Sequence, residues 1–264
     1  MCSQIIILMK SRLFNHSEFK YLLSFCLLFI VYHSAEYMLL FKNSIVGFFV
    51  FQLIFFLLAF LLGNWTNGNG FYSWGLSLKQ ISFKHISLGL LSGLLLYAFS
   101  FFSSLGFGLE KITSYPDFYS GVKSSLPFAF GVLFTSFSED ILTRGLVYTG
   151  LKDKLGTIGL IFISATIYLL NHIYRLADGP VAWIYLFLLG IVFVIPVINT
   201  RSLWFTGAMH WAGNTFFYVS HSVIITETIA VKFSPNYLFA FCIALFIFPI
   251  WRLTKYYSLI ESPK

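Results

Sequence analysis

Two carboxylates and a guanidinium interrupt an apolar stretch of this chain. Glu139, Asp140 and Arg144 lie within residues 125–150, a segment long and apolar enough to cross a bilayer. At the centre of a membrane helix each ionised group costs roughly 3 kcal/mol, while each Leu, Phe or Val contributes only about 0.5 kcal/mol of stabilisation. Ionisable residues in a span are by default a functional site that faces the protein interior, so we expect their partners on other helices.

The spacing of these three residues divides them into two roles. Asp140 and Arg144 are four residues apart, so they share a helix face and can neutralise each other. Glu139 lies about 100° around the helix and can face a different neighbour.

Two later apolar segments carry candidate partners. Tyr168 and His172 in one, and His210 and Asn214 in the other, have the same spacing of four residues, which places each pair on one helix face. This set is sufficient for hydrolysis by water. A buried carboxylate can act as general base, a histidine can relay the proton of the attacking water, and an amide with a second histidine can donate to the developing oxyanion. No GxSxG, HExxH or P-loop pattern offers another chemistry.

Composition places these segments in a membrane. The 264 residues are 58% hydrophobic, 20% aromatic and only 10% charged, with a mean hydropathy of +0.82, which indicates an integral membrane protein. The net charge of +7 is explained by lysines that flank spans. No basic patch interleaved with aromatic residues occurs, so we expect no nucleic-acid partner.

Hydrophobic segments predict an all-α, polytopic helical bundle that forms one membrane domain over residues 1–264. The linkers between them are short, and the longest are 64–75 and 110–125. About eight membrane spans are predicted at 21–41, 45–63, 86–109, 126–150, 157–174, 181–199, 203–222 and 237–253. Gly89 and Gly93 form a small-xxx-small pattern, which marks close helix packing.

Lys and Arg residues predict the orientation. Eleven of them lie on the side of the two termini and five on the other side. By the positive-inside rule we expect a multi-pass protein of the cell membrane with both termini cytoplasmic.

Three ordered motifs resemble those of the CPBP family of intramembrane proteases, which includes CAAX prenyl endopeptidases and bacteriocin self-immunity proteins. They are Glu139-Asp-Ile-Leu-Thr-Arg144, Tyr168-Leu-Leu-Asn-His172 and His210-Trp-Ala-Gly-Asn214, with spacings of 33 and 38 residues between Glu139, His172 and His210. The family pattern is EExxxR, FxxxH and HxxxN, so Asp140 replaces the second glutamate and Tyr168 the phenylalanine. The resemblance covers roughly residues 125–220, the expected catalytic core.

The resemblance implies roles for these residues. Glu139 and His172 would activate water, and His210 and Asn214 would stabilise the oxyanion. Asp140, Arg144 and Tyr168 would support them, with Asp140 as the partner of Arg144. The implied substrate is a membrane-associated or lipidated protein or peptide.

We expect no cofactor. Glu139, His172 and His210 also have the chemistry of a His₂Glu zinc site, which stays open as an alternative. We favour the reading without metal because Asn214 fits an oxyanion donor better than a ligand.

Two other functions remain as alternatives. One is a catalytically inactive relative that confers bacteriocin self-immunity or binds a membrane partner, against which the complete set of four catalytic residues argues. The other is an ion- or proton-coupled transporter. Against that reading, the motif-bearing segment has no repeat elsewhere in the chain. His33 and Glu36, three residues apart, are either a packing contact or a second functional pair.

The predicted helix starts place His172 and His210 at different depths in the membrane, although the two should lie in one site. His172 would lie roughly 22 Å from a helix start at 157, but His210 only about 10 Å from a start at 203. The fifth helix must therefore start outside the hydrocarbon, tilt, or begin later.

Overall fold

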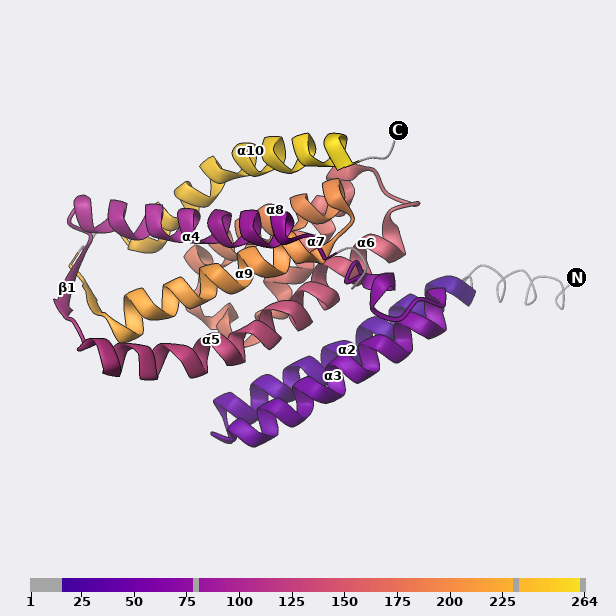
Figure 1. Ribbon diagram of the computed structural model, residues 1–264, viewed down its shortest axis with the longest axis horizontal. Helices are drawn as coiled ribbons and strands as arrows, with labels where there is room; N and C mark the ends of the chain where they lie inside the picture. Colours follow the sequence, from indigo (N-terminus) through magenta and orange to yellow (C-terminus); the bar gives the residue numbers. More distant parts are fainter. Residues whose placement is uncertain (1–15, 78–80, 230–232, 262–264) are drawn as a thin grey trace, which may run out of the picture.

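The computed structural model describes residues 16–77, 81–229 and 233–261, and most of them are helical (Figure 1). The α-helices are α2 (His16–Leu40), α3 (Ile45–Asn67), α4 (Phe83–Gly106), α5 (Phe118–Asp140), α6 (Leu146–Leu151), α7 (Thr157–Asn171), α8 (Pro180–Thr200), α9 (Leu203–Tyr218) and α10 (Pro235–Glu261). Shorter 3₁₀ or π segments are η1 (Gly70–Trp74), η3 (Ile141–Gly145), η4 (Ile173–Asp178) and η5 (Val219–Val223). The predicted all-α polytopic bundle is confirmed.

Several helices begin at a residue whose side chain accepts a hydrogen bond from the first turn. Ser44 caps α3, Ser82 caps α4, Asp117 caps α5 and Ser202 caps α9. Each cap satisfies a backbone N–H that has no partner within the helix, which fixes where the helix starts.

The predicted count of eight spans is not confirmed. Each predicted segment overlaps a helix, but α7 has 15 residues and α9 has 16, so both are short for a full crossing. Within the described part of the chain, the helices long and apolar enough to cross a membrane are Ser17–Leu40, Ile45–Asn67, Phe83–Gly106, Pro180–Thr200 and Pro235–Ser258. The segments predicted at 126–150, 157–174 and 203–222 are those that carry the candidate site residues.

The predicted span 126–150 is one continuous run of three helical segments. It begins at Phe118, earlier than predicted, and passes from α5 through the π-helical turn η3 into α6, which ends at Leu151. The π turn directly follows Glu139 and Asp140. Single π turns within α-helices are frequent at functional sites.

Helix α9 packs closely against α4. A Cβ atom on Gly89 would lie 2.2 Å from the Phe205 carbonyl oxygen, and one on Gly93 would lie 2.2 Å from that of Met209. Both glycines therefore permit a backbone approach that no side chain would allow. The close packing predicted from the small-xxx-small pattern is confirmed, and it sets the position of α9 in the bundle.

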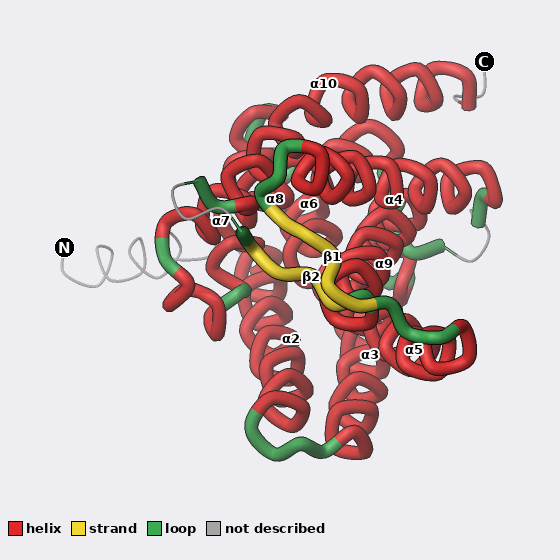
Figure 2. Tube along the Cα trace, turned by 90° about the vertical axis from the view of Figure 1, so that its left-hand side faces the viewer, coloured by secondary structure: helices red, strands yellow, loops and turns green. Residues whose placement is uncertain are grey.

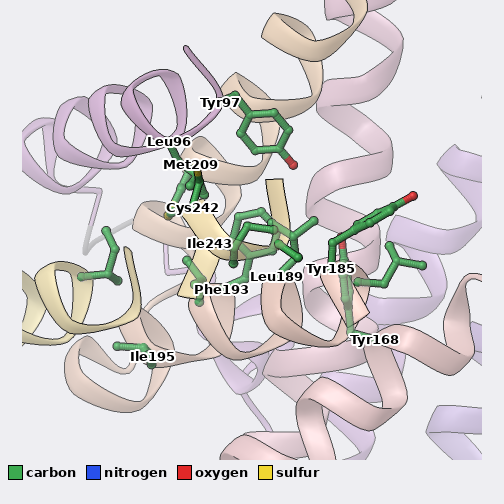
Figure 3. Packing of buried hydrophobic residues seen from close by; sticks show 14 of the residues in the cluster. Leu96, Tyr97, Tyr168, Tyr185, Leu189, Phe193, Ile195, Met209, Cys242 and Ile243 are labelled. Atoms are coloured by element: carbon green, nitrogen blue, oxygen red, sulfur yellow. The ribbon is translucent and has the colours of Figure 1, made fainter. Parts of the chain in front are cut away.

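A large hydrophobic core lies between α4, α7, α8, α9 and α10. Figure 3 shows part of it, with Tyr97, Tyr168, Phe193 and Met209 among the labelled residues. The α2–α3 hairpin runs along one side of this bundle (Figure 1). The start of α2 and the end of α10 lie at the same end of the molecule, as the predicted cytoplasmic termini would require.

A two-stranded antiparallel sheet lies at the other end (Figure 2). It pairs β1 (Glu110–Ser114) with β2 (Ile225–Thr228), and Glu110 is opposite Thr228. The sequence predicted only a polar linker over 110–125, and that expectation is corrected. The alternation typical of a strand is too short in these two segments to be seen.

Candidate active site

Glu139 lies at the centre of a polar cluster built from three helices. Its side chain is buried in the last turn of α5. Glu139 Oε1 lies 3.6 Å from His172 Nδ1, and Glu139 Oε2 lies 3.6 Å from His210 Nε2. The structure thus brings together three residues that the sequence predicted to act jointly.

Asp140 and Arg144 form a fully buried ion pair beside this cluster. Arg144 Nη1 donates to Asp140 Oδ1, and both side chains are inaccessible to solvent. The Arg144 guanidinium lies 4.4 Å from the centroid of the Tyr168 ring and 5.0 Å from that of Phe193, so two aromatic faces also stabilise its charge. The pairing predicted from the spacing is confirmed.

Asp140 has a second contact that the sequence did not reveal. Its Oδ1 lies 3.2 Å from His210 Nδ1, which therefore donates its proton to the carboxylate. With Nδ1 held in this way, Nε2 of His210 is directed toward Glu139. Asp140 thus orients an imidazole as well as neutralising Arg144, as the second residue of a catalytic dyad does.

His172 follows directly after the last residue of α7. Its Nδ1 donates to the Tyr168 carbonyl oxygen at 2.8 Å, which leaves Nε2 with the lone pair in the neutral ring. The Tyr168 ring packs edge-on against His172, with centroids 4.6 Å apart. The His172 side chain is 19% exposed, against 4% for Glu139 and 1% for His210, so the cluster is open on the His172 side.

Asn171 is a site residue that sequence reasoning missed. It is buried, and its Nδ2 donates to Glu139 Oε1 at 3.0 Å. The sequence did contain a signal for Asn171, because an amide side chain in an apolar helix directly precedes the motif histidine. On a continuing helix Asn171 and His172 would point about 100° apart. Because α7 ends between them, with His172 at φ −85° and ψ 49°, both side chains reach Glu139.

Asn214 lies one turn after His210 on α9 and is half-buried. Within the described residues its amide makes no hydrogen bond. The sequence therefore predicted its place on the His210 face, while its role as an oxyanion donor stays a prediction.

The zinc alternative fits these side chains poorly. Across residues 16–77, 81–229 and 233–261, no three His, Cys, Asp or Glu side chains are grouped so as to hold a metal ion. The nitrogen of His172 that faces Glu139 is Nδ1, and its proton is already donated to the Tyr168 carbonyl. A metal ligand needs that lone pair free.

Comparison with known proteins finds one family model that covers the cluster. Residues 121–216 match the family model for type II CAAX prenyl endopeptidases, described as Rce1-like. This segment is less than half of the chain, but it contains every predicted site residue. No curated protein and no solved structure matches the chain. The resemblance drawn from the three motifs is thereby confirmed, because residues 121–216 are similar to the type II CAAX prenyl endopeptidases of the CPBP family.

Proposed function

We propose that this protein hydrolyses a peptide bond of a membrane-associated or lipidated protein by means of a water molecule activated by Glu139. The family match indicates a membrane-embedded endopeptidase of the CAAX-protease type. The observation that carries the mechanism is the buried Glu139 carboxylate, which lies between the His172 and His210 imidazoles and accepts the Asn171 amide.

The first chemical step forms a tetrahedral intermediate. Glu139 takes a proton from water while the water oxygen bonds to the carbonyl carbon of the substrate, and the carbonyl π electrons move onto its oxygen. The separations of 3.6 Å from Glu139 to both imidazoles exceed a hydrogen bond, as is common for catalytic contacts without substrate. His172 lies on the open side of Glu139, where it would hold the water.

The second step breaks the peptide bond. The C–N bond cleaves as the oxyanion re-forms a carbonyl, and the proton held by Glu139 passes to the leaving amine. His210, oriented by Asp140, would donate from Nε2 to the oxyanion when both ring nitrogens carry protons. Asn214, one turn along the same helix face, would supply the second donor.

Asn171 is a positioning residue in this proposal. Its amide donates to Glu139 Oε1, which fixes the rotamer of the carboxylate and leaves Oε2 toward His210. Because Glu139, Asn171 and His210 are buried, each of these fixed dipoles acts more strongly than it would in water.

The substrate would reach the cluster from the membrane. The site residues lie on helices of the bundle, and the Lys and Arg distribution predicts that the ends of α6 and α8 are cytoplasmic. A lipidated or membrane-inserted segment would therefore present its peptide bond near the cytoplasmic side of the cell membrane. The reaction as written needs no metal.

Quantitative proteomics of protein termini in membranes tests the proposal. Cells that produce the wild-type chain should contain new membrane-protein termini that are missing in cells producing Glu139→Gln at equal abundance. Identical termini in both strains would refute proteolysis by Glu139. An unchanged set of termini together with a Glu139-dependent ion flux would favour the transporter alternative.

A further inference from the structure

A cavity lies at the end of the bundle that carries the β1–β2 sheet. It has a volume of about 210 Å³ and lies between the C-terminal half of α4, the end of α9, the start of α10 and both strands. His221 on its wall lies eleven residues after His210, roughly 16 Å farther along the helix direction. The cavity is therefore separate from the Glu139 cluster.

A carboxylate is buried in the wall of this cavity. Glu110, the first residue of β1, is buried, and its Oε1 lies 3.3 Å from His221 Nε2. Burial raises the pKa of Glu110, but the interactions with His221 and Ser104 together outweigh it, and the pKa lies below its ordinary value. Glu110 is thus ionised at neutral pH. The described ion-pair partner of Glu110 is therefore His221. The neighbouring Lys111 pairs instead with Glu227 on the exposed side of the sheet at 3.2 Å.

Aromatic rings form much of the remaining wall. They include Phe101, Phe216, Phe217 and Phe239. The His221 ring stacks on Phe217 with centroids 4.4 Å apart and meets Phe101 edge-on at 5.4 Å, so this basic side chain of the described lining lies between two rings. Ser100, Ser104 and Ser220 add polar residues to the lining.

These features together match one class of ligand. Aromatic faces attract cations through their quadrupoles, and a buried carboxylate supplies the counter-charge, which is the combination that recognises organic ammonium groups. The volume lies below the 300–1,000 Å³ of a typical drug-sized pocket, so it admits only a small ligand or the head of a larger one. In the described chain no third His, Cys, Asp or Glu joins Glu110 and His221, which favours an ammonium over a metal ion.

We propose that this cavity binds a small organic ammonium group, with Glu110 as its counter-ion and the Phe101, Phe216 and Phe239 rings as its walls. A free amine and the headgroup of an aminophospholipid carry the same chemistry. The cavity lies beside the β1–β2 sheet at one end of the helical bundle, where a headgroup can reach it.

Calorimetry on the purified full-length protein in detergent tests the proposal without any mutation. Choline and 3,3-dimethylbutan-1-ol have nearly the same shape, but only choline is charged. We expect choline to bind at least about tenfold more tightly. Equal affinity for both compounds, or no binding of choline, would overturn the assignment.

Variants then locate the site. Glu110→Gln should weaken choline binding at least about tenfold, because it removes the counter-charge and keeps the shape. Glu227→Gln, which changes an exposed carboxylate on the same sheet, should bind as wild type. Equal weakening by both changes would contradict the proposal. If Glu110→Gln does not fold, Phe239→Leu, which removes one ring, should weaken choline more than dimethylbutanol.

Choline binding measured in nanodiscs distinguishes a lipid headgroup from a free amine as the source of the ammonium group. If phosphatidylethanolamine, but not phosphatidylglycerol, competes with choline, the ligand is a lipid headgroup. If choline binds equally in both lipids, the ligand is a soluble amine. Glu139→Gln should bind choline as wild type in either lipid, so this test is independent of proteolysis.

Discussion

His210 Nδ1 lies 3.2 Å from Asp140 Oδ1, the same oxygen that accepts a hydrogen bond from Arg144 Nη1. One oxygen of Asp140 therefore contacts both the buried guanidinium of Arg144 and the His210 imidazole of the proposed catalytic cluster. Asp140 has both a structural and a positioning role, which makes its effects separable by mutation.

Asp140→Asn should lower both stability and rate. It leaves Arg144 as an unpaired buried charge, which costs about 3–5 kcal/mol, and it deprives His210 of the carboxylate that orients it. We expect a lower melting temperature in detergent and a lower specific activity of the protein that remains folded. Adding Arg144→Gln should restore part of the stability but not the rate. Full recovery of activity in the double variant would show that Asp140 acts only as the counter-charge of Arg144.

Asn171 variants test the hydrogen bond to Glu139. Asn171→Leu removes a donor to the general base, so kcat should fall by about tenfold or more with little change in KM. Asn171→Asp has nearly the same shape as the native side chain but places a second negative charge beside Glu139, so its rate should fall further. A purely structural role for Asn171 would give the opposite order, with the better-matched aspartate the more active variant.

Gly93→Ala tests whether α4 sets the position of α9. The new methyl would meet the Met209 carbonyl oxygen at 2.2 Å, so α9 must shift, at a cost of about 1–3 kcal/mol. Because His210 follows Met209 directly, activity should fall together with the melting temperature. Gly106→Ala at the end of the same helix has no atom within 4 Å of the new methyl and is the matched control. Equal behaviour of the two variants would mean that the close approach is not needed.

Chelation tests the expectation of a metal-free reaction. Hydrolysis by purified protein should persist after prolonged treatment with strong chelators, since the proposed steps need only side chains and water. Loss of activity on chelation that zinc alone restores, with one zinc bound per chain, would instead assign Glu139, His172 and His210 as ligands.

Helical spacing predicted those parts of the site that depend on a single helix. The Asp140–Arg144 pair and the shared face of His210 and Asn214 follow from residues four apart, and the motif order indicated which helices meet. Contacts that depend on a helix end or on tertiary packing could not be predicted in this way. Asn171 reaches Glu139 because α7 stops there.

The conflict between the depths of the two histidines has a partial answer. Helix α7 begins at Thr157, as the sequence predicted, so a later start is excluded. The two explanations left for this helix of 15 residues are a tilt and a start outside the hydrocarbon.

The Glu110–His221 contact could not be predicted from the sequence, because it joins a strand to a π turn across 111 residues. The His33–Glu36 pair does form, at 2.7 Å.

The central claim is that Glu139 removes a proton from water, and the rate of peptide cleavage by Glu139→Gln tests it most directly. The amide keeps the shape of the side chain and can still accept from Asn171, but it cannot take a proton. The assay uses purified protein with prenylated and unprenylated peptides that end in a CAAX sequence, or with a substrate found by terminal proteomics. The kcat of Glu139→Gln should be lower than that of the wild type by about 10² or more, at an unchanged melting temperature. Glu227→Gln should cleave as wild type. Cleavage by Glu139→Gln at the wild-type rate would contradict the account.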